Sequence, residues 1–192
     1  MRVQSLAIPE IKLITPSVFR DERGSFCETF VDRAIGAAGV RQPFVQDNHA
    51  VSIRRGVVRG LHFQAPPRAQ DKLVRVVRGS VLDVAVDIRV GSPTFGRHVS
   101  VTLSAANWTQ LLIPKGFAHG LCTLEPNTEV VYKVTDYYAP ECDHGLRWDD
   151  PALGIEWPIP AAEAILSPKD KLHPGIAELP AYFHYEPTKL AQ

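Results

Sequence analysis

The chain has 192 residues, of which 45% are hydrophobic and 22% are charged. These values fit one folded domain with a substantial core, and they exclude a disordered chain. The 21 basic and 21 acidic side chains cancel, so no overall charge draws the protein to nucleic acid or to a membrane surface, and an anionic ligand needs a local cluster of cations.

The N-terminal stretch MRVQSLAIPEIKLI has neither a sustained apolar core nor a small-residue cleavage site, which predicts that it is no signal peptide. No apolar run reaches the roughly 18 residues of a membrane-spanning helix. Three cysteines, Cys27, Cys122 and Cys142, are odd in number and widely spaced, as is typical of reduced thiols. We therefore expect a cytoplasmic protein with no membrane and no nucleic-acid partner.

Strand patterns dominate the rest of the chain, and only residues 31–39 and the stretch near 161–165 have a helical pattern. Residues 72–90 are rich in Val and Ile, with Gly-Ser at 79–80 between two runs, which predicts a β-hairpin. Residues 97–104 and 128–138 alternate polar and apolar side chains, and turn clusters recur at intervals of about 8–12 residues. This rhythm predicts an all-β fold, an antiparallel sandwich or barrel.

Beyond about residue 150 the chain becomes proline-rich, in WPIPAAEAILSPKDKLHPG. Such a segment fits a tail that lies over the surface of the barrel. Neither an internal repeat nor a linker divides the sequence, so we expect residues 1–192 to form a single domain.

The segment IPKGFAHGL, residues 113–121, resembles the second motif of the cupin jelly roll. Metal-binding cupins carry an H-x-H pair in their first motif, whereas this chain has His62-Phe63-Gln64 at that place. A transition-metal site needs three or four good ligands, and His62 with His119 supplies too few. The sequence therefore predicts no catalytic metal, and a metal-dependent cupin oxygenase does not fit.

His62 lies in the strand-like run RGLHFQ, and a histidine on a strand is more often a hydrogen-bonded core residue than a base. Four further titratable groups lie within or beside apolar runs, namely Lys72, Asp83, Tyr132 and Asp170. Each alone has a structural explanation. Their joint presence favours a site at which they converge.

A second group consists of the cations Arg23, Arg54, Arg55, Arg59 and Lys169. Arginines within or beside strands of a neutral protein indicate a planar, bidentate partner such as phosphate. A solvated surface is the alternative, and it suits Arg54 and Arg55 best. The sequence has no Walker loop and no GxGxxG, so a phosphate site would consist of side chains.

Taken together, five segments resemble the dTDP-4-dehydrorhamnose 3,5-epimerase family: RDERGSFCETF, VQDNHAVSIRRGVVRGLHFQAPPRAQDKLVRVVRGSVLDVAVDIRVGSPTFG, LLIPKGFAHGLCTL, YKVTDYYAPECDHGLRWDDPALGIEWP and LSPKD. They follow one another in the family's order between residues 10 and 171. The resemblance implies a cupin-type jelly roll with a few short helices. It also implies a cofactor-independent epimerase that inverts C3 and C5 of dTDP-4-dehydro-6-deoxy-D-glucose, and a homodimer that exchanges N-terminal strands. The alternatives are a C3-only or C5-only epimerase of a related nucleotide sugar, and a non-catalytic nucleotide-sugar-binding cupin.

The resemblance also implies a role for individual residues. The family's base is His62, its partner acid is Asp170, Lys72 supports the enolate and Tyr132 is the acid. Substrate contacts fall on Arg23, Phe26, Glu28, Gln46, Asn48, Arg59, His119, Tyr138, Asp143 and Lys169, of which Phe26 and Glu28 would serve the neighbouring subunit in a dimer. Asp143, followed by His144, departs from the family, which commonly has a glutamate there.

The residue chemistry agrees with these roles. C3 and C5 of a 4-keto sugar are both α to the carbonyl, so a histidine base can remove their protons without a cofactor. A partner aspartate fixes the tautomer of the histidine, and a lysine stabilises the enolate oxygen. Strict alternation would place Arg59 and His62 on opposite faces of a strand, so we expect a bulge at Gly60.

Overall fold

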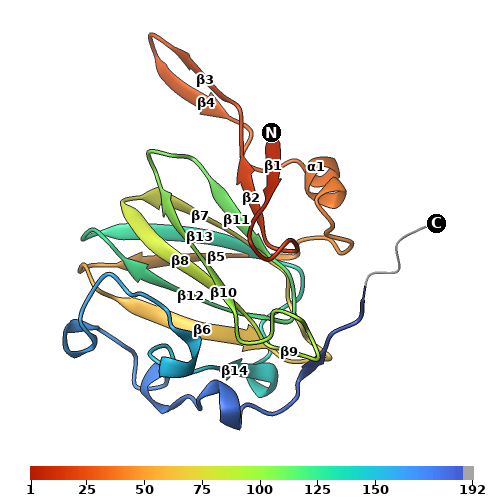
Figure 1. Cartoon of the computed structure of the whole chain (residues 1–192). Helices are drawn as coiled ribbons and strands as arrows, with labels where there is room; N and C mark the ends of the chain where they lie inside the picture. The colour runs from red at the N-terminus through yellow and green to blue at the C-terminus, as the bar shows by residue number, and fades with distance from the viewer. Residues whose placement is uncertain (188–192) are drawn as a thin grey trace.

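Two antiparallel β-sheets face each other and enclose the main hydrophobic core, as the computed structural model shows for residues 1–187 (Figure 1). This arrangement confirms the predicted all-β antiparallel sandwich. The last five residues of the predicted 1–192 domain lie outside the described part of the chain. Within residues 1–187 no helix is long and apolar enough to cross a membrane.

The first sheet has six strands in the order β1-β2-β11-β7-β13-β5, and the second has five in the order β10-β8-β12-β6-β14. The strands of the first are β1 (Arg2–Ser5), β2 (Lys12–Thr15), β11 (Gln110–Ile113), β7 (Lys72–Arg78), β13 (Thr128–Val134) and β5 (Gln46–Ser52). Those of the second are β10 (His98–Ser104), β8 (Ser80–Asp87), β12 (Phe117–Thr123), β6 (Val58–Gln64) and β14 (Asp143–Gly145).

Two small pairings and several short helices complete the described chain. The hairpin of β3 (Val18–Asp21) and β4 (Gly24–Cys27) stands apart from both sheets, and β15 (Phe183–His184) pairs with β9 (Arg89–Val90). The helices are α1 (Asp32–Ala37) and the 3-10 turns η1 (Pro140–Cys142), η2 (Pro151–Leu153), η3 (Ala161–Glu163), η4 (Asp170–Leu172) and η5 (Ile176–Glu178).

The core between the sheets follows from the alternation of side chains along each strand. In β7, Val74 and Val76 point inward, with exposed fractions of 0% and 4%, and meet Val81 and Ala85 of β8. Each such buried side chain stabilises the fold by about 1.5–3 kcal/mol. The same alternation places Lys72 on the inward face at the end of β7, where the apolar core gives way to polar groups.

The proline-rich tail lies over the outer face of the five-stranded sheet, on the lower side in Figure 1. Leu61 and Phe63 of β6 are buried there against Ile155, Leu179 and Tyr182. The sheet is therefore covered on both faces, which explains why β8 and β12 are buried along almost their whole length.

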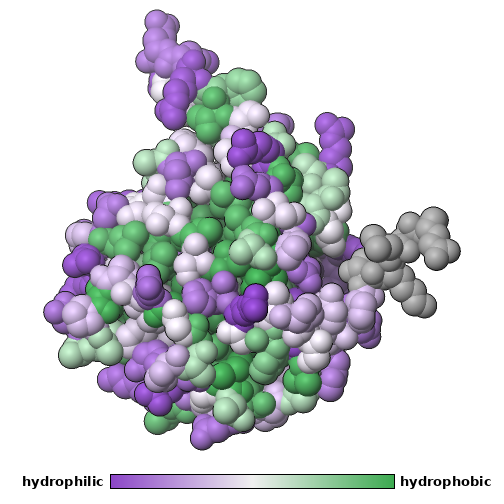
Figure 2. Space-filling model, in the orientation of Figure 1, coloured by the Kyte–Doolittle hydropathy of each residue, from purple (hydrophilic) through white to green (hydrophobic). Residues whose placement is uncertain are grey.

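The outer face of the six-stranded sheet is covered only in part. Ile35 of α1 packs on Ile14, Leu73 and Leu112, while neighbouring side chains of β5 stay exposed. The β3–β4 hairpin projects away from the sandwich at this side (Figure 1). Its tip is hydrophilic, and hydrophobic residues lie beside it (Figure 2).

The predicted hairpin at residues 72–90 is wrong, and of the two predicted helical segments only the first forms an α-helix. Residues 72–90 form no hairpin, because β7 and β8 belong to different sheets and Gly79 lets the chain cross between them with φ +74°. The helical pattern at 31–39 is confirmed by α1. The pattern near 161–165 yields only the short turn η3, after which Ile165 bridges Val57 in extended form.

Candidate active site

The polar side chains converge at one end of the sandwich, where two adjoining cavities of about 170 and 270 Å³ open between the sheets. Both cavities are lined by His62, Lys72 and Tyr132. His62 comes from β6 in the five-stranded sheet, whereas Lys72 and Tyr132 come from β7 and β13 in the opposite sheet. A ligand between the sheets would therefore meet His62 on one wall and Tyr132 on the other.

The predicted break at Gly60 is confirmed. Gly60 has φ +117°, and the pairing of β6 with β12 shifts register opposite it, between His119 and Leu121. A Cβ atom on Gly60 would lie 2.6 Å from the His119 carbonyl oxygen, so only glycine fits. The bulge brings Arg59 to the same cavity as His62. The Arg59 guanidinium donates to Ser52 Oγ at 3.2 Å and to the Val51 carbonyl at 3.1 Å.

His62 and Asp170 form a dyad. His62 Nε2 lies 2.5 Å from Asp170 Oδ1, and Asp170, at the start of η4, is 4% exposed. Burial alone would raise the pKa of Asp170, but the hydrogen bond and the charge of His62 outweigh burial and lower it. An ionised carboxylate accepts a hydrogen bond from Nε2–H, which leaves the lone pair of His62 on Nδ1.

A second histidine, His173, which the sequence reasoning missed, lies beside the dyad and near the same oxygen of Asp170. His173 Nε2 is 3.6 Å from Asp170 Oδ1, and its ring meets that of His62 edge to face, with centroids 5.6 Å apart. Burial, with the nearby His62, lowers the pKa of His173. Within residues 1–187 its buried Nε2 has no hydrogen-bond partner. Its position three residues after Asp170, within one short turn, is the sequence signal that could have identified it.

Lys72 and Tyr132 provide the opposing groups. Lys72 Nζ donates to the His62 carbonyl at 3.1 Å, and burial lowers the pKa of Lys72 to about 8, against the opposing effects of Asp143 and Asp83. Burial also raises the pKa of Tyr132, and Asp143 adds to the increase while Arg59 opposes it. At neutral pH, Lys72 is therefore a cation and Tyr132 a neutral hydroxyl that can give up a proton.

Asp83 does not line the cavity itself but contacts His119, which does. Asp83 is fully buried in β8, and its Oδ1 lies 2.9 Å from His119 Nε2 on β12. His119 in turn lines the cavity beside Arg59. The core acid therefore fixes the orientation of a cavity histidine.

The smaller cavity contains a polar cluster around Asp143. Lys169 Nζ lies 2.5 Å from Asp143 Oδ2, and the Tyr138 hydroxyl donates to the same oxygen at 3.1 Å. The Tyr138 amide donates to Gln46 Oε1, and Gln46 Nε2 donates to Asn48 Oδ1. Asp143, although shorter than a glutamate, thus still contacts the predicted lysine and tyrosine.

Gln64, at the place of the second cupin histidine, has a structural role. Its amide donates to the carbonyls of Arg68 and Tyr137 and accepts from the Ala139 amide. These bonds attach the loop that follows β13 to β6.

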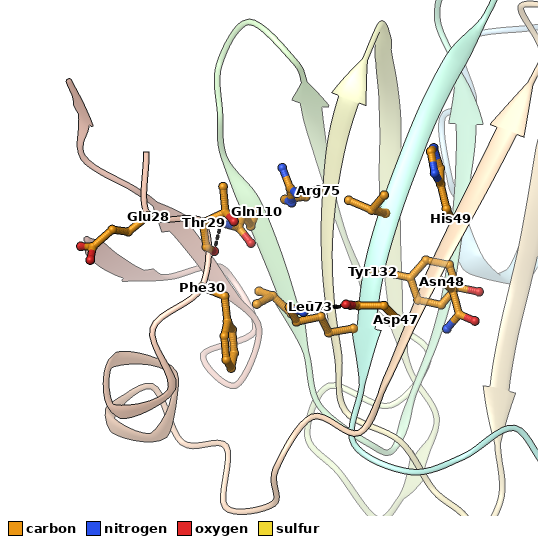
Figure 3. Close-up of a pocket in the computed structure, with 12 residues that line it drawn as sticks. Glu28, Thr29, Phe30, Asp47, Asn48, His49, Leu73, Arg75, Gln110 and Tyr132 are labelled. Atoms are coloured by element: carbon orange, nitrogen blue, oxygen red, sulfur yellow. Dashed lines mark hydrogen bonds and ion pairs between the residues drawn. The ribbon is translucent and has the colours of Figure 1, made fainter. Parts of the chain in front are cut away.

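Three predicted contacts are not brought to this cavity within the chain. Arg23 pairs with Asp21 at the tip of the hairpin, and Phe26 is 67% exposed on β4. Glu28 lines another groove, of about 420 Å³, on the outer face of the six-stranded sheet, which shares Asn48 and Tyr132 with the smaller cavity. In Figure 3 Glu28 lies on the N-terminal segment, across the groove from Asp47.

Comparison with known proteins shows which family the sequence matches. The sequence model of a family described as dTDP-4-dehydrorhamnose 3,5-epimerase matches residues 5–178. The enzyme of that name from Sinorhizobium fredii is 51% identical over 185 residues, covering 96% of this chain and 94% of that protein.

Solved structures of the same kind have the same fold. The dTDP-6-deoxy-D-glucose-3,5-epimerase of Legionella pneumophila, in complex with dTDP-4-keto-L-rhamnose, is 44% identical with a TM-score of 0.91, over 96% of this chain and 98% of that chain. The dTDP-4-dehydrorhamnose 3,5-epimerase of Bacillus anthracis, with TDP and PPi bound, is 46% identical with a TM-score of 0.87, over 91% and 98%.

Proposed function

The chain belongs to the dTDP-4-dehydrorhamnose 3,5-epimerase family, and on that premise we propose which of its residues carry out the reaction. The substrate is dTDP-4-dehydro-6-deoxy-D-glucose, and inversion at C3 and C5 gives dTDP-4-dehydro-L-rhamnose. One observation supports the proposal most strongly: a His62–Asp170 dyad, with His62 half-buried and Asp170 buried, faces Lys72 and Tyr132 within shared cavities.

The reaction begins at the base. Nδ1 of His62 takes the proton from a carbon next to the C4 ketone, and Asp170 stabilises the resulting imidazolium without itself being protonated. The electrons of the broken C–H bond move onto the C4 oxygen as an enolate. Lys72, still protonated at neutral pH, stabilises that oxygen; such a donor in a closed site is worth about 3–4 kcal/mol.

Inversion requires a proton from the opposite face of the sugar. Tyr132 projects from the opposite sheet, so its hydroxyl can protonate the enolate carbon on the face that His62 does not reach. The same groups can act at C3 and at C5, since both carbons are adjacent to the ketone. Each inversion removes one proton and delivers one proton, and no electron leaves the sugar. We therefore propose that the reaction needs neither a metal nor a cofactor.

The diphosphate and the thymine occupy the rim of the site. Arg59 and Lys169 bind phosphate oxygens, with His119 beside them, and Tyr138, 59% exposed, stacks on the base. Gln46, Asn48 and Asp143 orient this part of the ligand.

We also propose that the protein is a homodimer. The exposed hairpin with Phe19 and Phe26, 61% and 67% exposed, projects from the protomer and suits a partner surface. In that dimer Arg23 and Phe26 complete the neighbouring site. A cytoplasmic location stays a prediction.

Solvent deuterium incorporation tests the reaction. We expect NMR of the product formed in heavy water to show label at both C3 and C5, also after exhaustive chelation. Label at one carbon alone would identify a single-centre epimerase, and no label would exclude catalysis. His62→Ala should abolish exchange, whereas Tyr132→Phe should retain exchange and lose inversion, because only the removal of the proton needs His62.

A further inference from the structure

Three potential metal-binding atoms lie close together in the proposed site, one each from His62, Asp170 and His173. The two histidine nitrogens and the Asp170 oxygen all lie within 4.8 Å of one another, and among residues 1–187 no other group of at least three His, Cys, Asp or Glu side chains meets that criterion. Two imidazoles and one carboxylate are the ligand types of open zinc sites, which keep a fourth position free.

The separations are close to those that zinc requires. Ligand bonds of about 2.0–2.2 Å in a tetrahedron place neighbouring donor atoms about 3.4 Å apart. His173 Nε2 already lies 3.6 Å from Asp170 Oδ1, and the 2.5 Å contact of His62 with Asp170 has to open by less than 1 Å. A metal ion would then replace the proton between His62 Nε2 and Asp170, and this proton would move to Nδ1, so that His62 binds as a neutral imidazole.

His173 has no other polar role among the described residues. Its side chain is 9% exposed, and its Nε2 has no hydrogen-bond partner, which is costly for a buried polar atom. The ring packs closely on Gly145, where an added Cβ atom would collide with Nε2. An unpaired ring nitrogen is therefore held beside the dyad.

We propose that these three residues form an inhibitory site for zinc or a similar divalent transition-metal ion. Zinc bound to His62 Nε2 leaves the ring proton on Nδ1, the atom that takes up the sugar proton in the proposed reaction, so the base is blocked. The inhibitory effect rests on the proposed function, whereas metal binding does not. Zinc thus acts on this protein in the opposite sense to a catalytic metal: removing it restores activity.

The test combines inhibition and direct binding. We expect zinc chloride to inhibit the epimerase reversibly, with activity recovered by EDTA, and His173→Leu to require at least about tenfold more zinc, as for loss of a metal-site group. His184→Leu, at an exposed histidine on β15, is the matched control and should behave like the wild type. Equal zinc sensitivity of His173→Leu and wild type, or a wild type that zinc does not inhibit, would overturn the proposal.

Cobalt(II) provides a readout that does not depend on activity or on the folding of a variant. One equivalent of cobalt bound by two nitrogens, one oxygen and a water should give the visible absorption bands of a four-coordinate ion in the wild-type protein. These bands should disappear when zinc is added. Absence of such bands rules out the metal site, even if the enzyme is active. Cobalt bands in a protein without epimerase activity would support the metal site and contradict only the proposed reaction.

Discussion

Lys72 occupies a position that the fold disfavours and the proposed chemistry requires. Its ammonium group lies between apolar strands, with one hydrogen bond, to the His62 carbonyl. A pKa of about 8, against an ordinary value of 10.5, means that burial destabilises the charged form by about 3 kcal/mol. The enolate formed during the reaction would supply the missing negative partner.

Lys72→Met should therefore stabilise the protein and inactivate it. We expect the free energy of unfolding at pH 7 to rise by about 1–3 kcal/mol, because the buried charge is lost. Between pH 8 and 10.5 the folded wild type binds fewer protons than the unfolded chain, so wild-type stability rises with pH and the gap to the variant closes. Urea unfolding at pH 7 and at pH 10 measures both effects.

Lys115→Met, at an exposed lysine, is the control and should leave the free energy of unfolding unchanged at either pH. A Lys72→Met protein that is less stable than the wild type at pH 7 would show that the charge already has a partner.

Single residues also mark the limit of what the sequence can predict. Lys72, Tyr132 and Asp170 were identifiable because each is titratable and lies within or beside an apolar run. His173 was not identified, since its role depends on the contact of η4 with the end of β6. That contact joins residues at least 108 positions apart in the chain. Apart from the spacing of three residues between Asp170 and His173, local sequence patterns carry no information about such a contact.

At the scale of elements, the strand pattern was predictable and the connections were not. Alternation identified β10 and β13 because one side of each faces the core. The same rules misassigned residues 72–90, since Gly-Ser between two apolar runs serves a hairpin and a crossover between sheets equally well. What decides between them is the partner strands, β11 and β12, which come later in the chain.

The bulge in β6 was predictable because the proposed roles of Arg59 and His62 require both side chains to reach one cavity. Gly60→Ala should lower the free energy of unfolding by at least about 3 kcal/mol, since the new methyl group would meet backbone atoms at 2.6 Å in a conformation with φ +117°. Thermal unfolding and the KM for the nucleotide sugar measure the loss of stability and the displacement of Arg59.

The control for this change is Gly36→Ala, in the exposed part of α1, where a Cβ atom has no neighbour within 4 Å. That substitution should stabilise the protein by up to about 1 kcal/mol. If Gly60→Ala were as stable as the wild type, the register shift would not depend on glycine.

At the scale of the whole molecule, two of the predicted substrate contacts lie away from the proposed site. The cavity between the sheets contains the proposed base, enolate support and acid, whereas Arg23 and Phe26 lie on a hairpin that points away from it. An exposed aromatic hairpin beside an uncovered sheet face is difficult to explain in a monomer. A two-fold dimer would solve both problems at once, because each protomer would give its hairpin to the other.

Mixing two inactive variants decides whether the hairpin acts in the partner's site. Arg23→Ala and His62→Asn should each have low activity alone. In a hybrid dimer, one site combines an intact His62 with an intact Arg23 from the partner, so random re-association should restore about one quarter of wild-type activity. A mixture of His62→Asn with Lys72→Met is the control: both residues lie in the same chain's cavity, so every hybrid site lacks one of them and no activity should return. If the first mixture also stays inactive after subunit exchange, Arg23 acts within its own chain or not at all, and the hairpin serves another purpose.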